Sequence, residues 1–332
     1  MLDGMSSTNQ TRNESSSRNA MSWVCLVVVW FVWGSTYLGI RVAVQAMPPL
    51  LMAGSRYLIA GVILAPAILA FRRGKLPPLG REDFKSILYS AILLLVIGNG
   101  VVSYAEVQLT SGVTAIIVAT VPLWMLLIDG YLTRRIKPLA LLGVAVGLPG
   151  VVFLIGTQSS HGALTRALLV LCSSGAWAFG SVLARRRDPN RLNPLYPALE
   201  MVAGGVIMLV VGILSGELRT LHLAGMGTAA IVGYVWLILA GSIVGYSAYG
   251  YAVRTLPSGV VATYAYINPV VAVALGVLLL HEPLTSNVLI GGAAVIVSVI
   301  ITLLANRAVE PTREASSAVR EQLVDSAAMR NP

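Results

Sequence analysis

Charged side chains are rare in this sequence, and a few of them stand within or beside long apolar runs. Arg56 lies seven residues after Pro49, and Glu200 lies six residues after Pro194 in a similar run. A buried arginine can bind a carboxylate through two parallel hydrogen bonds, and a buried glutamate can accept an ammonium group or a proton. Both are therefore candidates for function, although each could instead bind backbone carbonyls or extend its charge to a membrane surface.

Glu106 stands at the junction of two apolar runs and is a candidate site for proton coupling, together with Glu200. A carboxyl group that loses water on burial holds its proton more tightly, so it could titrate during a transport cycle. The alternative is that Glu106 is solvated, as acidic residues at such junctions often are.

Polar and aromatic side chains within the apolar runs supply the rest of a candidate binding site. Tyr264 and Asn268 are four residues apart and share one face of a helix. The candidate cavity residues are Tyr37, Arg56, Asn99, Trp124, Trp177, Tyr264 and Asn268. Such a set suits small neutral, zwitterionic or amphipathic solutes rather than nucleotides, which need several buried cations. Aromatic residues at this spacing can also serve packing or interfacial belts.

Two prolines occupy equivalent places in a segment that the chain contains twice. Residues 104–122 and 251–269 agree at eight of nineteen positions with an offset of 147 residues, and the agreement includes Pro122 and Pro269. Proline within a helix removes one backbone hydrogen bond and frees a carbonyl. We expect both prolines to break their helices beside a cavity, with kinks that serve packing as the alternative.

The motifs of common enzymes are missing from the sequence. It contains no H-E-x-x-H, G-x-S-x-G or P-loop pattern, and its three histidines show no metal-ligand spacing. We therefore expect no enzyme activity, no metal and no cofactor, and no energy source other than a gradient. The net charge of +9 is spread in short clusters between apolar runs, which does not favour nucleic acid as a partner.

The composition predicts an all-α integral membrane protein. The 332 residues are 56% hydrophobic and 11% charged, against about 25% charged in soluble domains. Continuous apolar runs of roughly 20 residues favour membrane-spanning helices over β-barrel strands, which alternate. We expect ten transmembrane helices, over residues 22–42, 50–71, 85–105, 111–131, 138–156, 163–183, 194–214, 229–250, 258–279 and 285–305.

The basic residues indicate the orientation of these helices. With a cytoplasmic amino terminus, nineteen Lys and Arg residues fall inside and three fall outside. This asymmetry predicts that both termini are cytoplasmic.

The repeated segment predicts a duplicated architecture. Its offset is about half of the apolar region, so each copy belongs to a five-helix unit, and an odd number of spans inverts the second unit. We expect a disordered tail at 1–20, five-helix repeats at 21–157 and 158–306, and a second disordered tail at 307–332. Inverted repeats support alternating access around a shared pocket.

Several segments resemble the EamA family of the drug/metabolite transporter superfamily. They include "WGSTYLGIR" (33–41), "SGVTAIIVATVPL" (111–123) and "SGVVATYAYINPVVAVALGVLLLHEPL" (258–284). "NGVVSYAEVQLTSG" (99–112) is similar to a subgroup of inner-membrane metabolite exporters. The resemblance implies two EamA-type repeats and a multi-pass carrier of the inner (plasma) membrane that exports amino acids or related metabolites. The first repeat has "LTRRIKPL" where the family often places an acidic residue, so Glu282 of the second repeat has no acidic counterpart.

The leading hypothesis is a secondary transporter that exports amino acids, related small metabolites or amphipathic compounds by alternating access. Its partners would be a small-molecule substrate, the lipid bilayer and protons as a candidate coupling ion, in a monomer or homodimer. The alternatives are an uptake carrier or an uncoupled facilitator and, from another class, a membrane-embedded enzyme or scaffold.

Overall fold

The computed structural model describes residues 3–73, 76–134, 138–155, 162–185, 193–221, 226–256 and 258–307. All regular elements within these ranges are helices. Seven are long and apolar enough to cross a membrane, and three shorter apolar helices lie at Leu141–Leu154, Tyr264–Leu280 and Ser286–Thr302. The protein is therefore an all-helical membrane protein, as its composition predicts.

The first half of the chain forms α1 (Asp3–Ala43), α2 (Pro49–Phe71), α3 (Arg81–Ser90), α4 (Val101–Ala105), α5 (Ser111–Val118), α6 (Val121–Leu132) and α7 (Pro138–Ile155). A π-helical segment, η1 (Ala91–Gly100), joins α3 to α4. The two-residue interruption at Ala119–Thr120 divides one apolar run into α5 and α6.

The second half forms α8 (Ala163–Arg185), α9 (Tyr196–Leu214), the 3₁₀ turn η3 (Glu217–Thr220), α10 (Thr228–Trp236), α11 (Gly245–Thr255), α12 (Ser258–Val261), α13 (Tyr264–Leu280) and α14 (Ser286–Arg307). A second π-helical segment, η5 (Leu237–Val244), joins α10 to α11. Each half thus contains one π-helical segment within its third long apolar run.

The start of α1 differs from the sequence prediction. Residues 3–20 continue the helix toward the amino terminus, whereas the sequence favours a disordered tail there. Extending an existing helix adds one hydrogen bond per residue without a new nucleation cost. The helix formed by the apolar part of α1 can therefore continue through the polar residues that precede it. The predicted tail at 307–332 lies, beyond Arg307, outside the described residues.

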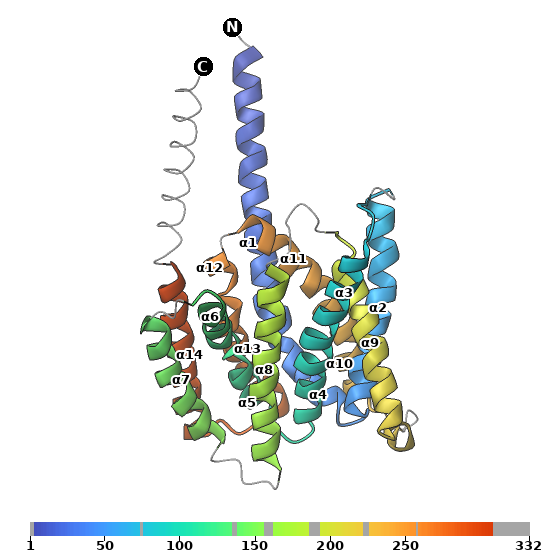
Figure 1. Cartoon of the computed structure of the whole chain (residues 1–332), viewed down its shortest axis with the longest axis vertical. Helices are drawn as coiled ribbons and strands as arrows, with labels where there is room; N and C mark the ends of the chain where they lie inside the picture. The colour runs from blue at the N-terminus through green and yellow to red at the C-terminus, as the bar shows by residue number, and fades with distance from the viewer. Residues whose placement is uncertain are drawn as a thin grey trace.

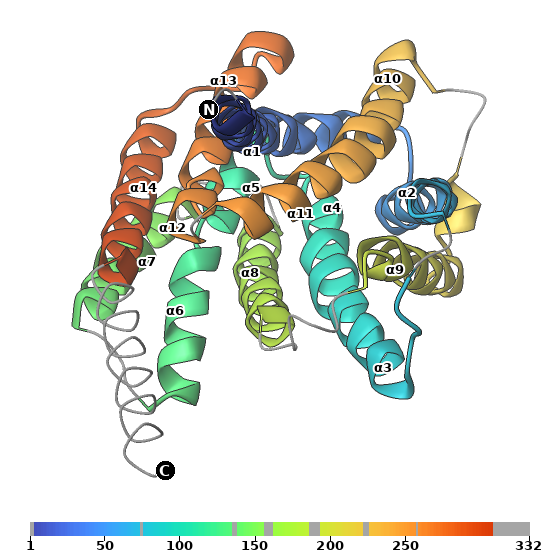
Figure 2. The ribbon, with the colours of Figure 1, turned by 90° about the horizontal axis from the view of Figure 1, so that it is seen from above.

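Two antiparallel helix pairs flank the centre of the bundle. Figures 1 and 2 show α7 beside α14 on one flank and α2 beside α9 on the other. Ser298 of α14 donates a hydrogen bond to the backbone carbonyl of Gly143 in α7 (2.6 Å). The start of α1 and the end of α14 lie at the same end of the bundle (Figure 1), and we name the opposite end the far end.

Glycines let α2 and α9 approach closely. A Cβ atom at Gly205 of α9 would lie 2.6 Å from the backbone nitrogen of Leu58 and 2.8 Å from the backbone oxygen of Gly54. Backbone atoms cannot move aside as the end of a side chain can. The distance between the two helices therefore depends on the missing side chain.

We expect Gly205→Ala to lower the free energy of unfolding by about 1–3 kcal/mol, because the helices must separate to admit the methyl group. Thermal unfolding of the purified protein in detergent measures the effect. Gly250→Ala in α11 is the matched control, because a Cβ there meets nothing within 4 Å. Equal unfolding temperatures for the two variants would contradict this packing argument.

Candidate functional site

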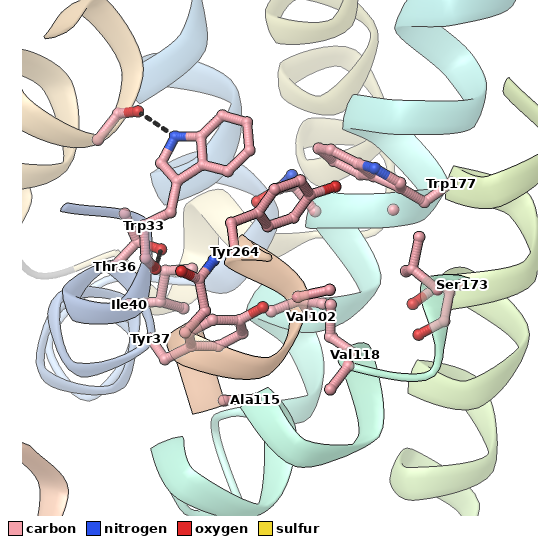
Figure 3. A pocket seen from close by; sticks show the side chains of 18 of the residues that line it. Trp33, Thr36, Tyr37, Ile40, Val102, Ala115, Val118, Ser173, Trp177 and Tyr264 are labelled. Atoms are coloured by element: carbon pink, nitrogen blue, oxygen red, sulfur yellow. Dashed lines mark hydrogen bonds between the residues drawn. The ribbon is translucent and has the colours of Figure 1, made fainter. Parts of the chain in front are cut away.

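A cavity of about 820 Å³, including its opening, lies between the two halves of the chain. Side chains from α1, α2, α4, α5, α6, α8, α11 and α13 line it, and the π-helical segments η1 and η5 contribute Asn99 and Gly241. Figure 3 shows Tyr37, Tyr264 and Trp177 directed into the same space from three different helices. A concave site lined by aromatic side chains and a few polar groups is the usual form of a small-molecule pocket.

Arg56 supplies the positive charge of the cavity wall. Its side chain is 3% exposed, and its Nε donates a hydrogen bond to the hydroxyl of Ser242 (3.0 Å). Its guanidinium lies 4.6 Å from the centre of the Tyr57 ring. Nη1 is buried without a hydrogen-bond partner. Because arginine keeps its charge when buried, this nitrogen is a ready donor for an anionic group in the cavity.

Aromatic rings form one side of the cavity. Trp33 of α1 packs against Tyr246, Tyr249 and Tyr264, with ring centroids 4.9–5.5 Å apart. The indole nitrogen of Trp33 also donates to the backbone carbonyl of Gly241 (3.3 Å). This cluster joins α1 of the first half to α11 and α13 of the second, so it fixes an apolar surface at the junction of the halves.

The π-helical segments occupy matching places beside this cavity. With the offset of 147 residues, Asn99 at the end of η1 corresponds to Tyr246, which follows η5, and both side chains line the cavity. Gly98 leaves room for Trp177 of α8, since a Cβ there would lie 2.7 Å from the indole ring. The wider turn of a π-helix often occurs at functional sites.

Most of the residues predicted for the site come together. Tyr37, Arg56, Asn99, Trp177, Tyr264 and Asn268 all line the cavity, as does Pro269. The Asn268 amide, with its nitrogen toward the neighbouring carbonyls, donates to Tyr264 (3.2 Å) and Trp30 (3.0 Å).

The other predicted residues lie outside the lining. Trp124 packs beside Gly175 of α8, and Glu200 lies half-buried on α9.

Pro122 is buried in the first turn of α6, directly after the interruption between α5 and α6. Pro269 lies inside α13, which continues through it, and the nearest interruption of that run is at Ala262–Thr263. The two prolines therefore have different effects on their helices.

The candidate residues predicted from the sequence do not include Trp33, Thr36, Tyr57, Ser173, Ser174, Gly241 and Tyr246. All of these residues line the cavity. One feature of the local sequence could have indicated Tyr57: it follows Arg56 directly, and a tyrosine beside a buried arginine can pack against its guanidinium.

Glu106 is fully buried at the far end of the bundle, in the connection between α4 and α5. Neither of its carboxylate oxygens has a hydrogen-bond partner, and Arg41 donates to its backbone carbonyl rather than to its side chain. Burial raises the pKa of Glu106 well above its usual range, and the charge of Glu282 raises it further, while Arg41 and Arg56 oppose the shift. A neutral, protonated carboxyl group fits this environment.

Two other carboxylates at the far end join the second half of the chain to the first. Glu282, after α13, accepts hydrogen bonds from the backbone nitrogen (2.9 Å) and hydroxyl (2.8 Å) of Ser111 at the start of α5. Glu217, after α9, accepts from the backbone nitrogens of Leu50 (3.0 Å) and Leu51 (2.9 Å) in α2. Each carboxylate caps the positive end of a helix in the opposite half.

We expect Glu282→Gln to lower the free energy of unfolding by about 1–2 kcal/mol, because the amide removes the negative charge and replaces one of the two accepting oxygens with an NH₂ group that cannot accept. Thermal unfolding in detergent provides the measurement. Glu82→Gln is the matched control, since Glu82 is exposed and pairs with Lys85 on the surface. A Glu282→Gln variant as stable as the control would show that the cap contributes little.

The fold and the cavity define a class of protein: a helical membrane transporter with a central pocket. Comparison with known proteins agrees, because the pattern of the EamA-like transporter family matches residues 21–156 and again residues 164–304. The chain therefore belongs to the EamA-like transporter family.

Its relatives include proteins named as transporters. The chain is 38% identical over 280 residues to the "Uncharacterized inner membrane transporter YedA" of Escherichia coli K12, covering 84% of this chain and 89% of that protein. It is 25% identical over 295 residues to the "Probable amino-acid metabolite efflux pump" of the same organism, covering 86% and 95%. A solved crystal structure with 18% identity and a TM-score of 0.60 covers 88% of this chain and 99% of the other, which shows a similar fold.

Proposed function

We propose that this chain is a secondary transporter that exports amino acids or related small amphipathic metabolites by alternating access. The observation that carries the proposal is the buried, partly unpaired guanidinium of Arg56 on the wall of a cavity between the two halves. A relative named as an amino-acid metabolite efflux pump supports the substrate class and the direction. The family and the relatives' names indicate a transporter rather than an enzyme.

The proposed architecture has ten membrane spans in two inverted five-helix repeats. Seven helices are long and apolar enough to cross a membrane, and together with the three shorter apolar helices they support a count of ten. Two matches to one family pattern, and a π-helical segment in the third run of each half, support the duplication. An inverted pair of repeats can exchange conformations, and this exchange is the physical basis of alternating access.

We place the protein in the inner membrane with both termini in the cytoplasm, because basic residues gather on that side of the predicted spans. The far end would then face outward. It is filled by buried apolar side chains such as Leu109 and Val113, and Glu217 and Glu282 tie the two halves together there. These contacts support a conformation closed to the outside.

Transport into inverted membrane vesicles tests the proposal. Vesicles that contain the protein should accumulate at least one compound from a panel of labelled amino acids and small amphipathic metabolites, and vesicles without it should not. An imposed pH gradient separates proton exchange from an uncoupled facilitator, because a facilitator only equilibrates its substrate. If no compound crosses faster than in the control vesicles, the proposed function is wrong.

A further inference from the structure

The wall of the cavity carries a net positive charge. Among the described residues that line it, Arg56 is the one Lys, Arg, His, Asp or Glu. Its described contacts are a hydrogen bond to the neutral Ser242 and the Tyr57 ring, and no acid among the described residues forms an ion pair with it. Glu106, whose pKa Arg56 lowers, is a more distant electrostatic partner. A buried charge without a counterion is unfavourable, so a ligand that brings one negative charge would neutralise the site.

A zwitterion would neutralise Arg56 but would bring an ammonium group with it. The two acids considered for proton coupling, Glu106 and Glu200, do not belong to the lining of the cavity. Aromatic rings can bind an ammonium through their faces. Here the Trp33, Tyr249 and Tyr264 rings pack on one another, with centroids 4.9–5.8 Å apart, so part of their surface is already in contact with other rings. Among the described lining residues, the cavity therefore offers a charged partner for an anion and only neutral groups for a cation.

The rest of the lining suits an apolar body. Trp33 and Tyr264 lie on one side of the cavity and Trp177 of α8 on another (Figure 3). A ring or branched chain between these side chains would lose its contact with water, while its carboxylate met Nη1 of Arg56.

We propose that the cavity selects amphipathic monocarboxylates with a net charge of −1, such as N-acylated amino acids and aryl-substituted 2-hydroxy acids, over zwitterionic amino acids. This inference rests on the proposed function and narrows its substrate class. The distinguishing feature is the absence of a free ammonium group on the ligand, not the presence of a carboxylate alone.

Four compounds that share a phenyl ring test the selectivity on the purified full chain. At about pH 6, below the ordinary pKa of an α-amino group, N-acetyl-L-phenylalanine and 3-phenyllactate are anions, L-phenylalanine is a zwitterion, and L-phenylalaninamide is a cation. Dissociation constants come from the rise in unfolding temperature with ligand concentration. We expect both anions to bind at least about 10-fold more tightly than L-phenylalanine, and the amide not to bind, because each ammonium remains uncompensated. Equal or tighter binding of L-phenylalanine, binding of the amide, or no binding by any of the four would overturn the inference.

Flux measurements separate this inference from the proposed function. In proteoliposomes, uncoupled movement of a monoanion carries charge, so an imposed potassium diffusion potential should change its rate, whereas uncoupled movement of a zwitterion should not respond. Exchange for one proton adds the same charge to both fluxes, so the monoanion and the zwitterion still differ by one charge. Tight binding of the anions without any flux would contradict the transporter and leave the selectivity standing. Flux of L-phenylalanine without binding of either anion would contradict the selectivity and leave the transporter standing.

Discussion

Arg56→Gln is expected to lower the rate of transport of carboxylate substrates by about 10- to 100-fold, the range of a hydrogen bond between charged groups. In the wild type, Nη1 of Arg56 is buried without a partner on the cavity wall, so the substrate carboxylate can complete its hydrogen bonding. Glutamine removes the charge and the two-pronged donor. Initial rates in inverted vesicles give the measurement.

The same substitution should leave the unliganded protein as stable as the wild type, or more stable. Removing a buried charge that has no counterion removes a desolvation cost. A loss of transport together with an unchanged or raised unfolding temperature would therefore distinguish a ligand role from a structural one. Lower stability with a proportional loss of all transport would instead indicate that Arg56 serves packing.

Two matched variants complete this test. Arg56→Lys keeps the charge but loses the planar fork, so we expect an intermediate rate. Arg166→Gln removes an arginine outside the cavity, which donates to the carbonyl of Tyr104 and packs on its ring. Transport by that variant should match the wild type. If Arg56→Gln transports every carboxylate-bearing compound as fast as Arg166→Gln does, Arg56 is not a ligand.

Much of the membrane region can be predicted from the sequence, because the length of an apolar run is enough to assign a helix to it. A run of about 20 apolar residues has to form a helix in lipid, where every backbone group needs an internal partner. The same reasoning brings Arg56, Tyr37 and Asn268 into the cavity, since polar groups in such runs avoid lipid. The ten-span count and the inversion of the repeats stay predictions that topology measurements can test.

Features that depend on tertiary packing could not be predicted from local sequence. The π-helical segments η1 and η5 need an extra residue per turn, and no residue pattern specifies where it is inserted. Trp124 and Trp177 look equivalent in the sequence, yet only Trp177 reaches the cavity, because Gly98 leaves room for its ring. Contact between Glu282 and Ser111 joins residues 171 positions apart, which no local motif reports.

Glu106→Gln is expected to abolish the response of transport to a pH gradient while substrate binding remains. Burial and the charge of Glu282 raise the pKa of Glu106, so the conformation with this carboxyl buried binds its proton more tightly than an opened one. That conformation is therefore favoured at acidic pH, and its advantage is lost as the pH rises from the ordinary glutamate range through the raised pKa. Glutamine imitates the protonated acid at every pH.

Two measurements check this expectation. Unfolding temperatures between pH 5 and 9 should fall with rising pH for the wild type more steeply than for Glu106→Gln, because the variant has no proton to lose at this site. Gradient-driven flux should fall at least about 10-fold in the variant, the loss expected when a step needs a proton that cannot be released. A Glu82→Gln variant controls for a lost surface carboxylate.

The position of Glu106 explains why its proton would couple to the opening of the far end. Its side chain is buried there, in the connection that leads into α5. The start of α5 is capped by Glu282 from the other half. Opening that end separates the halves, admits water to Glu106 and lowers its proton affinity, so proton release and opening favour each other. Full gradient-driven flux in Glu106→Gln would assign the coupling to another residue.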